Sequence, residues 1–302
     1  MATTLHAEVL HRSQTVTISD VCCRPYDREC GAEEVSPANH IVFPRRGVFL
    51  KHIGKEEIVG DPNHVLFFRR NEPYRVAHPV GQGDDCTVLA FPTELLAESV
   101  AAYQPRVEER QEQPFEFTHS PSEPGLVFAQ QKLRQKAVAK VKDPLALEEL
   151  ALEVLGWVLR NAYFSRGFCP QPRRSSTARA HREQVQRTCL FLDSHFAEDL
   201  DLAEISRSVH CSLFHLARLF KRATGLSLHQ YRTRLRLRVA LENIVSGEND
   251  LTQLALNLGF SSHSHFTDLF HRAFGVAPSE CRREASARVL RELNEKLKEV
   301  PL

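Results

Sequence analysis

The sequence of 302 residues contains no long hydrophobic run. A membrane span needs roughly 18 consecutive apolar residues, so we expect no membrane segment. The first residues also lack the basic start and the apolar stretch of a secretory signal peptide, which makes the cytoplasm the expected location. We find neither a phosphate-binding glycine loop nor a nucleophilic triad, and we therefore predict a protein that is not an enzyme.

The eight cysteines are scattered through the chain, so a disulfide scaffold is not expected. With 42% hydrophobic and 25% charged residues, the composition is typical of a folded protein, and the length suggests about two domains. The net charge of +1 hides a division, because residues 172–302 carry 20 Lys and Arg against 15 Asp and Glu. This basic excess is modest and fits phosphate binding by the C-terminal half.

Residues 7–91 contain short apolar runs separated by turn signals, a pattern that predicts many short strands in a barrel or a sandwich. Helical periodicity follows and predicts helices over residues 93–103, 124–142 and 144–164. The third helix has an apolar stripe made of Leu147, Leu150, Ala151, Val154, Leu155 and Val158. Two interpretations of this stripe stay open, namely packing on the strands and a dimer seam.

Residues 167–179 contain two prolines and small polar residues without apolar periodicity, and they are predicted to be a linker. A helical region is predicted over residues 180–284. Residues 285–302 form an amphipathic pattern that predicts a surface helix at the end of the sequence.

A pattern occurs twice in the C-terminal region, with an offset of 50 residues. Phe220 and Phe270 are one such pair, and Gly225 and Gly275 are another. Each copy has a polar start, an apolar spine, a basic end and a final glycine. This pattern is typical of a helix-turn-helix unit, whose second helix enters the major groove of DNA.

In the first copy, Asp201 and Glu204 have the spacing of a capping box, and Ser212 is a suitable N-cap for the second helix. Gly225 is expected to end that helix in a left-handed conformation. Phe214 and Arg218 are predicted to face away from the apolar spine.

In the second copy, Asp250 and Gln253 have the capping spacing, Gly259 is a turn residue, and Ser261 is the predicted N-cap. Between the two copies, residues 229–244 are predicted to form an arginine-rich helix that holds the units at a fixed separation.

These residues resemble the AraC/XylS family of bacterial transcription regulators over about residues 180–284. The matching positions include Leu216, Arg218, Phe220, Gly225, Gly259, Phe260, Phe266, Phe270, Gly275 and Pro278. His210 replaces the usual turn glycine, His271 the usual lysine and Cys281 the usual tyrosine. The resemblance implies a DNA-binding domain at 180–284 that docks both second helices into successive major-groove segments of double-stranded DNA.

Arginine pairs bidentately with guanine, and methyl or aromatic groups contact thymine, so polar and aromatic side chains on these helices are expected to read bases. The base-contact candidates are Phe214, Arg218, His263, Ser264, His265 and Thr267. The phosphate candidates, which position the protein without specifying sequence, are Lys221, Arg222 and Arg272.

The resemblance also implies an α+β chain of two domains. Residues 1–166 would sense an effector and dimerise, through a cupin-like β-barrel at 7–91 followed by helices at 93–166. The implied function is a DNA-binding transcription regulator. The family favours an activator, which would add RNA polymerase as a partner to a homodimer and to an unidentified small-molecule, metal or redox effector.

Enzymatic cupins use a clustered His-x-His with a carboxylate to hold a metal, and this sequence has no such pair. Cys23, Cys30, His78 and Cys86 are nevertheless candidates for a zinc site, because three thiolates and an imidazole suit tetrahedral Zn²⁺. Two other interpretations stay open: the thiols sense oxidants, or they are small buried hydrophobes.

Two other classes of protein compete with this prediction. DNA-repair alkyl acceptors join a zinc-bound cysteine domain to a similar DNA reader, but their cysteine spacing is not found here. A helical protein-interaction module is the other class, and failure of residues 172–302 to bind any DNA at low salt would favour it.

Overall fold

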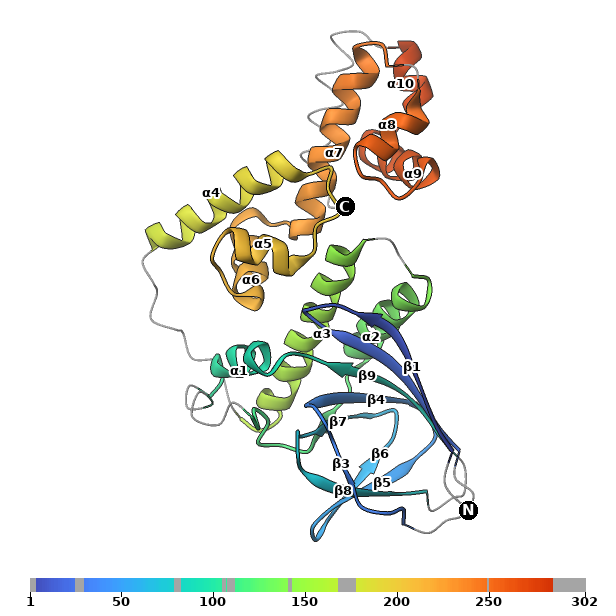
Figure 1. Ribbon diagram of the computed structural model, residues 1–302, viewed down its shortest axis with the longest axis vertical. Coiled ribbons are helices and arrows are strands. Elements are labelled where there is room, and N and C mark those ends of the chain that lie inside the picture. Colours follow the sequence, from blue (N-terminus) through green and yellow to red (C-terminus); the bar gives the residue numbers. More distant parts are fainter. Residues whose placement is uncertain are drawn as a thin grey trace. The chain divides into compact units, whose positions relative to one another are not determined.

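A computed structural model describes residues 4–24, 30–78, 83–104, 107, 112–140, 143–167, 178–248 and 250–284. The chain divides into two compact units (Figure 1). The N-terminal unit holds Met1–Val141 and Leu150–Ser175, and the C-terminal unit holds Lys142–Glu149 and Ser176–Leu302. Most of the predicted linker and all of the predicted tail helix lie outside the described residues. No helix in the described part combines the length and the hydrophobicity that crossing a membrane requires.

The N-terminal unit contains two antiparallel sheets. The first has the strand order β1 (Thr4–Arg12), β2 (Thr17–Arg24), β9 (Asp84–Ala90), β4 (His40–Arg46), β7 (His64–Phe68) and β10 (His119–Pro121). The second has the order β3 (Glu34–Val35), β8 (Pro73–Ala77), β5 (Phe49–Ile53) and β6 (Glu56–Gly60). The described strands therefore form no closed barrel, which corrects the prediction of a cupin-like barrel. Strand β10 lies in a region where only helices were predicted.

Side chains from both sheets meet in one core. It contains Val42, Phe49, Ile58, Leu66, Phe68 and Cys86. Lys51 is fully buried beside this core, where its Nζ donates to the Phe67 carbonyl at 2.7 Å and lies 3.8 Å from the centre of the Phe68 ring. Burial lowers the pKa of Lys51 to about 8, because water no longer solvates its charge.

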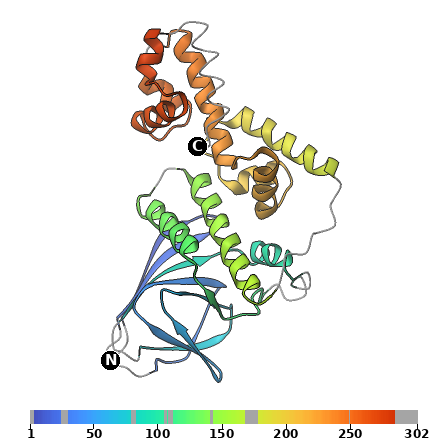
Figure 2. The same cartoon turned by 180° about the vertical axis from the view of Figure 1, so that it is seen from behind.

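The three predicted helices of the first half are present as α1 (Thr93–Ala101), α2 (Pro124–Val138) and α3 (Pro144–Phe164). Figures 1 and 2 show α2 beside the middle of α3, next to the six-stranded sheet. On α3, Ala151, Val154, Leu155 and Val158 are inaccessible to solvent, and Leu147 is 3% exposed. The apolar stripe thus packs inside the chain and is not a dimer seam.

The helices of the C-terminal unit are α4 (Ala178–His195), α5 (Leu202–Ser208), α6 (Leu213–Thr224), α7 (Leu228–Val245), α8 (Leu251–Asn257), α9 (His263–Phe274) and α10 (Pro278–Glu284). We call α5 with α6 the first helix pair and α8 with α9 the second. Aromatic side chains of α9 fill the core of the second pair, where Phe266, Phe270 and Phe274 are fully buried against Leu241 and Ile244 of α7.

Candidate nucleic-acid interface

The first helix pair is capped as the sequence predicts. The Asp201 carboxylate accepts from the Glu204 backbone N–H at 2.7 Å, and the Glu204 carboxylate accepts from the Asp201 N–H at 2.8 Å. Ser212 occupies the N-cap position of α6. Gly225 ends the helix with a φ of 74°, and its N–H donates to the Lys221 carbonyl at 2.9 Å. Local hydrogen bonds therefore fix the start of α5 and the end of α6, whereas the Ser212 side chain makes no cap hydrogen bond to the described residues at the start of α6.

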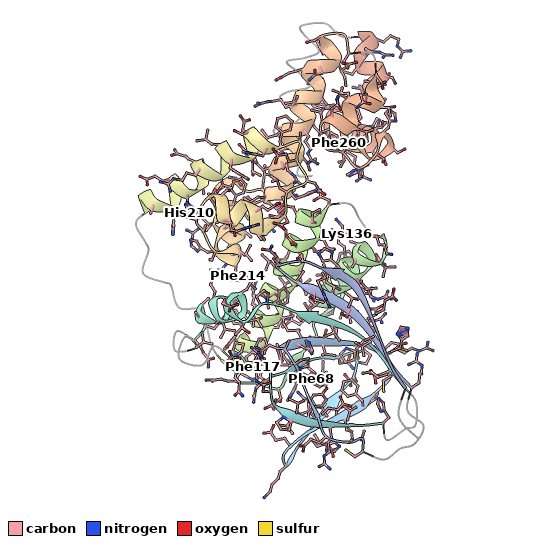
Figure 3. All side chains as sticks on the ribbon, viewed as in Figure 1. Phe68, Phe117, Lys136, His210, Phe214 and Phe260 are labelled. Carbon is pink, nitrogen blue, oxygen red and sulfur yellow. The ribbon has the colours of Figure 1, made fainter. Side chains whose placement is uncertain are left out.

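The turn between α5 and α6 contains a strained residue. His210 has a φ of 52°, a conformation that costs a residue with a Cβ about 1–2 kcal/mol, and this is the position where the family usually has glycine. Figure 3 labels His210 at this turn and Phe214 on α6. The Cys211 N–H donates to the Ser206 carbonyl at 3.0 Å and helps to hold the turn.

The exposed face of α6 carries Arg218 but not Phe214. Phe214 is 7% exposed, so the prediction that it contacts a base is wrong. An aromatic ring removes a large apolar surface from water when it packs inside, and this gain places Phe214 with the apolar spine. Arg218 is exposed, and its guanidinium carbon lies 5.3 Å from the centre of the Phe214 ring. Phe214 therefore positions Arg218 through a cation–π contact.

The second helix pair is capped slightly differently from the prediction. The Asp250 carboxylate accepts from the N–H groups of Thr252 and Gln253, but the Gln253 amide donates to Asn257, so the reciprocal half of a capping box is missing. The N-cap of α9 is Ser262, whose hydroxyl accepts from the backbone N–H of His265 at 3.1 Å. The predicted cap, Ser261, is one residue too early because α9 begins at His263.

The predicted base-contact residues of α9 differ in their exposure. His263 and Ser264 are exposed, whereas His265 is half-buried with its Nδ1 2.9 Å from the Ser261 hydroxyl. Burial lowers the pKa of His265, so its ring is neutral at pH 7 and suits hydrogen bonding more than phosphate neutralisation. The hydroxyl of Thr267 is withdrawn from solvent and has no partner among the described residues, so it needs another rotamer to reach DNA.

The predicted phosphate-binding residues all lie on the exposed surface. Lys221 and Arg222 are at the end of α6, and Arg272 is at the equivalent place on α9 beside the exposed His271. The first helix pair therefore presents two long cationic side chains at this end, and the second presents one.

A buried arginine joins the two helix pairs. Arg236 of α7 is 5% exposed, and its guanidinium donates to the carbonyls of Phe196 at 2.6 Å, Gly259 at 2.7 Å and Glu198 at 3.0 Å. Gly259 has a φ of 80°, and a Cβ there would lie 2.2 Å from the Ala197 carbonyl oxygen. The turn of the second pair is thus locked against the loop that precedes the first pair.

The sequence predicted that α7 holds the two pairs at a fixed separation but gave no sign that two of its arginines are buried. Arg232 is 1% exposed and donates to the carbonyl of Leu200 at 3.3 Å and to the Asp143 carboxylate at 3.0 Å. These two charges stabilise the fold and are removed from the exposed basic surface.

The first residues of α3 belong to the C-terminal unit and cap its helices. The Glu148 carboxylate accepts from the N–H of Leu202, the first residue of α5, at 2.8 Å. The Glu149 carboxylate accepts from the N–H groups of Leu228 and His229, at the start of α7, at 2.7 and 2.9 Å. Carboxylates satisfy the free N–H groups and the positive dipole end of a helix. The sequence signal for this contact was a group of acids at the start of an apolar helix.

Asp143, just before α3, forms a buried ion-pair network. Its carboxylate lies 3.0 Å from Arg232 and 3.1 Å from Nε2 of His229. Burial alone would raise the pKa of Asp143, but the contacts with His229 and Arg232 outweigh it and hold this pKa well below its usual range.

In the N-terminal unit, only part of the predicted zinc set comes together. Cys23 and His78 form a close buried group with Asp84, whereas Cys30 is exposed and Cys86 donates to the Asp84 carboxylate. Burial raises the pKa of Cys23 to about 11 and raises that of Cys86 further. Because the thiolate is the reactive form, these values disfavour oxidant sensing by these two thiols.

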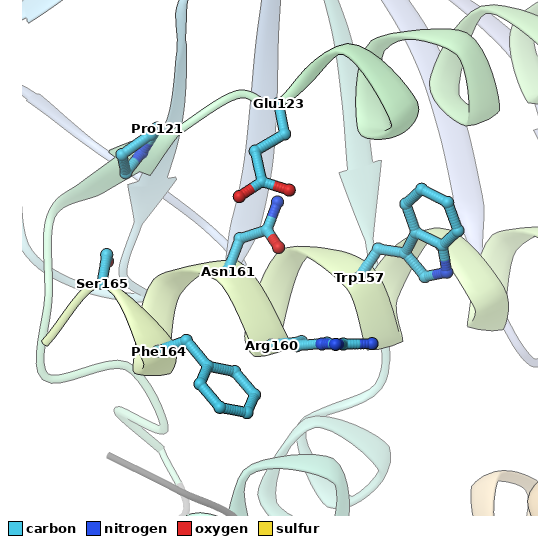
Figure 4. A pocket seen from close by; sticks show the side chains of 7 residues that line it. All are labelled: Pro121, Glu123, Trp157, Arg160, Asn161, Phe164 and Ser165. Atoms are coloured by element: carbon cyan, nitrogen blue, oxygen red, sulfur yellow. The ribbon is translucent and has the colours of Figure 1, made fainter. Parts of the chain in front are cut away.

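A groove on the N-terminal unit follows one face of α3 (Figure 4). Its volume is about 420 Å³, and its lining residues are Pro121, Glu123, Trp157, Arg160, Asn161, Phe164 and Ser165. Trp157 is 43% exposed and Phe164 is 46% exposed, and they are seven residues apart on the same helical face. Phe128 on α2 is 70% exposed. Large exposed apolar side chains of this kind often mark a partner surface.

A family model described as a helix-turn-helix domain matches residues 205–284. The regulatory protein PocR of Salmonella typhimurium is 27% identical over 104 residues, which are 34% of each chain. The transcriptional activator RhaS of Shigella boydii is 36% identical over 93 residues, which are 31% of this chain and 34% of RhaS. The match thus spans about a third of each relative.

Two solved structures are similar. One is a transcriptional regulator with an AraC-type DNA-binding domain from Chromobacterium violaceum, with 26% identity, coverage of 35% of this chain and 95% of that chain, and a TM-score of 0.33. The other is ToxT from Vibrio cholerae O395, with 12% identity, coverage of 91% and 100%, and a TM-score of 0.34. At these TM-scores, no conclusion about this chain rests on either.

Proposed function

We propose that the chain is a transcription regulator of the AraC type that reads two successive major-groove segments of double-stranded DNA. The match of residues 205–284 to a helix-turn-helix domain supports this proposal. One observation carries the proposal furthest. The two helix pairs present similar exposed faces on α6 and α9, and the buried Arg236 joins the pairs through three hydrogen bonds. Two reading helices held at one separation suit two groove segments about one helical turn apart.

Arg218 is the main base reader in this proposal. Its guanidinium is exposed, is held over the Phe214 ring and has the geometry to pair bidentately with guanine. On α9 we assign base reading to His263 and Ser264, with His265 and, after a rotamer change, Thr267 beside them. The phosphate contacts fall to Lys221, Arg222 and Arg272.

The experiment is a selection of bound sequences from random double-stranded DNA with the full chain, followed by titrations at several salt concentrations. Arg218→Ala is expected to cost about 1–3 kcal/mol on the selected site and to relax the choice at one base pair. Arg222→Ala is expected to weaken binding to all sequences equally and to reduce the salt slope by about one unit.

Arg238→Ala is the matched control, because Arg238 is an exposed arginine of the scaffold helix α7. Equal losses for Arg218→Ala on selected and random DNA would remove its base-reading role. No DNA binding by the full chain at low salt would favour the protein-interaction module.

The two reading helices are expected to contribute unequally. The α6 face offers Arg218, Lys221 and Arg222, whereas the α9 face has a neutral His265 and His271 at a position where the family usually has lysine. We therefore expect Arg218→Ala to weaken binding more than His263→Ala. Equal losses would contradict this asymmetry.

We further propose that the N-terminal unit controls DNA binding through α3. This one helix starts in the C-terminal unit, where Glu148 and Glu149 cap α5 and α7, and its residues from Leu150 onward belong to the N-terminal unit. A signal that displaces α3 would remove these caps and shift the arrangement of the first helix pair. Allosteric coupling of this kind is usually about 1–3 kcal/mol.

Glu149→Gln tests this route. It keeps the shape of the side chain but leaves one acceptor oxygen for the two N–H groups of Leu228 and His229, and its NH2 group faces the other donor. It should therefore weaken the cap of α7 and change DNA affinity without touching the DNA face. Glu153→Gln, on the same helix and exposed, is the control. If both variants bind DNA like the parent chain, α3 does not carry the signal.

Activation through RNA polymerase and homodimerisation complete the proposal. The similarity to RhaS, a transcriptional activator, supports the first, and the exposed Trp157, Phe164 and Phe128 support the second. Trp157→Glu should shift the chain toward monomer in light scattering, and an unchanged mass would place any dimer contact elsewhere. Transcription in vitro with purified polymerase and the selected site distinguishes activation from repression.

A further inference from the structure

Three buried side chains that can each bind a metal meet in the N-terminal unit. Cys23 on β2 lies directly opposite Asp84 on β9 in the strand register, and His78 immediately follows β8 of the other sheet. Their ligand atoms all lie within 4.8 Å of one another. The three residues are 8%, 5% and 4% exposed, respectively. The group therefore connects the two sheets from inside.

Two glycines allow this close approach. A Cβ on Gly83 would lie 2.0 Å from the Cys23 carbonyl oxygen, and a Cβ on Gly47 would lie 2.2 Å from the Gly83 carbonyl oxygen. Gly47 also has a φ of 83°. Backbone packing thus presses the start of β9, with Asp84, against the end of β2.

The negative charge of the Asp84 carboxylate is not balanced by a fixed cation among the described residues. The Asp84 carboxylate lies 2.6 Å from Nε2 of His78 and accepts from the Cys86 thiol at 3.1 Å. Arg24, the nearby cation, donates to the backbone carbonyl of Asp84 and pairs with the carboxylate of Asp85 instead. In the described part of the chain, no lysine or arginine pairs with the Asp84 carboxylate. A buried carboxylate without a fixed cation is costly.

We propose that Cys23, His78 and Asp84 bind a divalent transition-metal ion of the Zn²⁺ type. The sulfur, nitrogen and oxygen donors suit Zn²⁺ and Co²⁺ and do not suit the all-oxygen preference of Mg²⁺ or Ca²⁺. One thiolate and one carboxylate balance the two positive charges. The Cys23 thiol releases its proton to solvent as its sulfur binds the metal, and Nε2 of His78 gives up the proton it shares with the Asp84 carboxylate, so that the neutral ring carries its proton on Nδ1.

The geometry needs little adjustment. Tetrahedral coordination at about 2.0–2.3 Å places ligand atoms roughly 3.5 Å apart. With Nε2 of His78 as the ligand, its 2.6 Å separation from the Asp84 carboxylate has to open by roughly 0.9 Å, and a pair at the 4.8 Å limit has to close by roughly 1.3 Å. The Cys86 thiol stays on the second oxygen of Asp84 and orients it, as outer-shell donors do in metal sites. Water takes the fourth position. The proposed ligand set differs from the predicted zinc set, because it has Asp84 in place of Cys30 and Cys86.

Metal binding to the chain is measured directly, so the result does not depend on whether the chain binds DNA. The full chain, stripped of metal by a chelator, is titrated with Co²⁺ and then with Zn²⁺. We expect one Co²⁺ per chain, a thiolate-to-cobalt charge-transfer band, and loss of this band when Zn²⁺ displaces Co²⁺. Zn²⁺ should also raise the melting temperature, because it binds the folded state.

Variants identify the ligands. Cys23→Ser and Asp84→Asn should remove the charge-transfer band or the stoichiometric binding. Cys22→Ser is the matched control, because Cys22 is the neighbouring thiol on the opposite face of β2 and should leave binding unchanged. Cys86→Ala should weaken the metal affinity by about 10–100-fold, and Cys86→Ser, which keeps a donor, should restore it.

Circular dichroism establishes whether each stripped variant folds. If Cys23→Ser does not fold, the Co²⁺ and Zn²⁺ titrations of the parent chain test the proposal. A parent chain with no charge-transfer band and no rise in melting temperature with Zn²⁺ overturns the proposal and leaves His78 and Asp84 as a buried ion pair. Equal loss of binding in Cys22→Ser also overturns the assignment of Cys23.

Discussion

Replacement of Arg236 by leucine tests how the two helix pairs are joined. Arg236 is 5% exposed, so the change places an apolar side chain in a buried site. It also removes every hydrogen-bond donor of the guanidinium. The carbonyls of Phe196 and Gly259 lose their hydrogen bonds from Arg236, and the Glu198 carbonyl keeps only the longer bond from Arg232 at 3.4 Å. Burial lowers the pKa of Arg236 to about 10, so the group is still charged at pH 7 and its hydrogen bonds are charge-assisted.

The expected magnitude follows from these bonds. Each buried acceptor left without a donor costs about 1–3 kcal/mol. The release of a buried guanidinium offsets part of the sum, because its own burial is unfavourable. We therefore expect Arg236→Leu to lower the free energy of unfolding by about 3–6 kcal/mol. DNA affinity should fall further than stability alone explains, because the second reading helix loses its fixed position.

Urea unfolding followed by circular dichroism measures the first effect, and titration with the selected DNA measures the second. Arg238→Leu, on the exposed side of the same helix, should stay within about 0.5 kcal/mol of the parent chain. A cost below about 1 kcal/mol for Arg236→Leu, or equal costs for the two variants, would show that these three hydrogen bonds do not join the helix pairs.

Three further predictions concern single residues. Burial lowers the pKa of Lys51 from 10.5 to about 8. Between these pH values the unfolded chain binds more protons than the folded chain, so the free energy of unfolding should rise by up to about 3 kcal/mol from pH 8 to 10.5. Lys51→Met should lack this rise in urea unfolding. His210→Gly should raise the free energy of unfolding by about 0.5–1 kcal/mol because it relieves the positive φ, and a lower melting temperature would contradict that. Gly259→Ala should destabilise by more than about 2 kcal/mol, whereas Gly225→Ala, which has a similar φ but open space for a Cβ, should cost only about 1–2 kcal/mol in the same assay.

Local signals in the sequence were sufficient for the helices and most of the caps. The range 144–164 is the observed helix α3, and Asp201 with Glu204 forms the predicted capping box. Both follow from interactions within a few residues, namely helical periodicity and side chains that bond to N–H groups three positions away. Phe214 shows the weakness of such patterns, because one aromatic residue next to an apolar spine was assigned to the wrong face.

Long-range pairing was not visible in the sequence. Glu149 accepts from His229, 80 residues further along the chain, and nothing in a pattern of charges identifies that partner. The same holds for the pairing of strands into two sheets, since the sequence pattern left a barrel and a sandwich open, and for the contact between Asp84 and His78. Burial of Arg236 depends on carbonyls 23 to 40 residues away.

The most direct test of the central claim is the binding of the full chain to its selected DNA, with about five base pairs inserted between the two contacted segments. This insertion turns one segment by half a helical turn, so a rigid pair of reading helices cannot reach both. We predict that affinity falls to that of DNA with a single segment. Unchanged affinity on the lengthened DNA, or a selected site with only one contacted segment, would contradict two-segment reading.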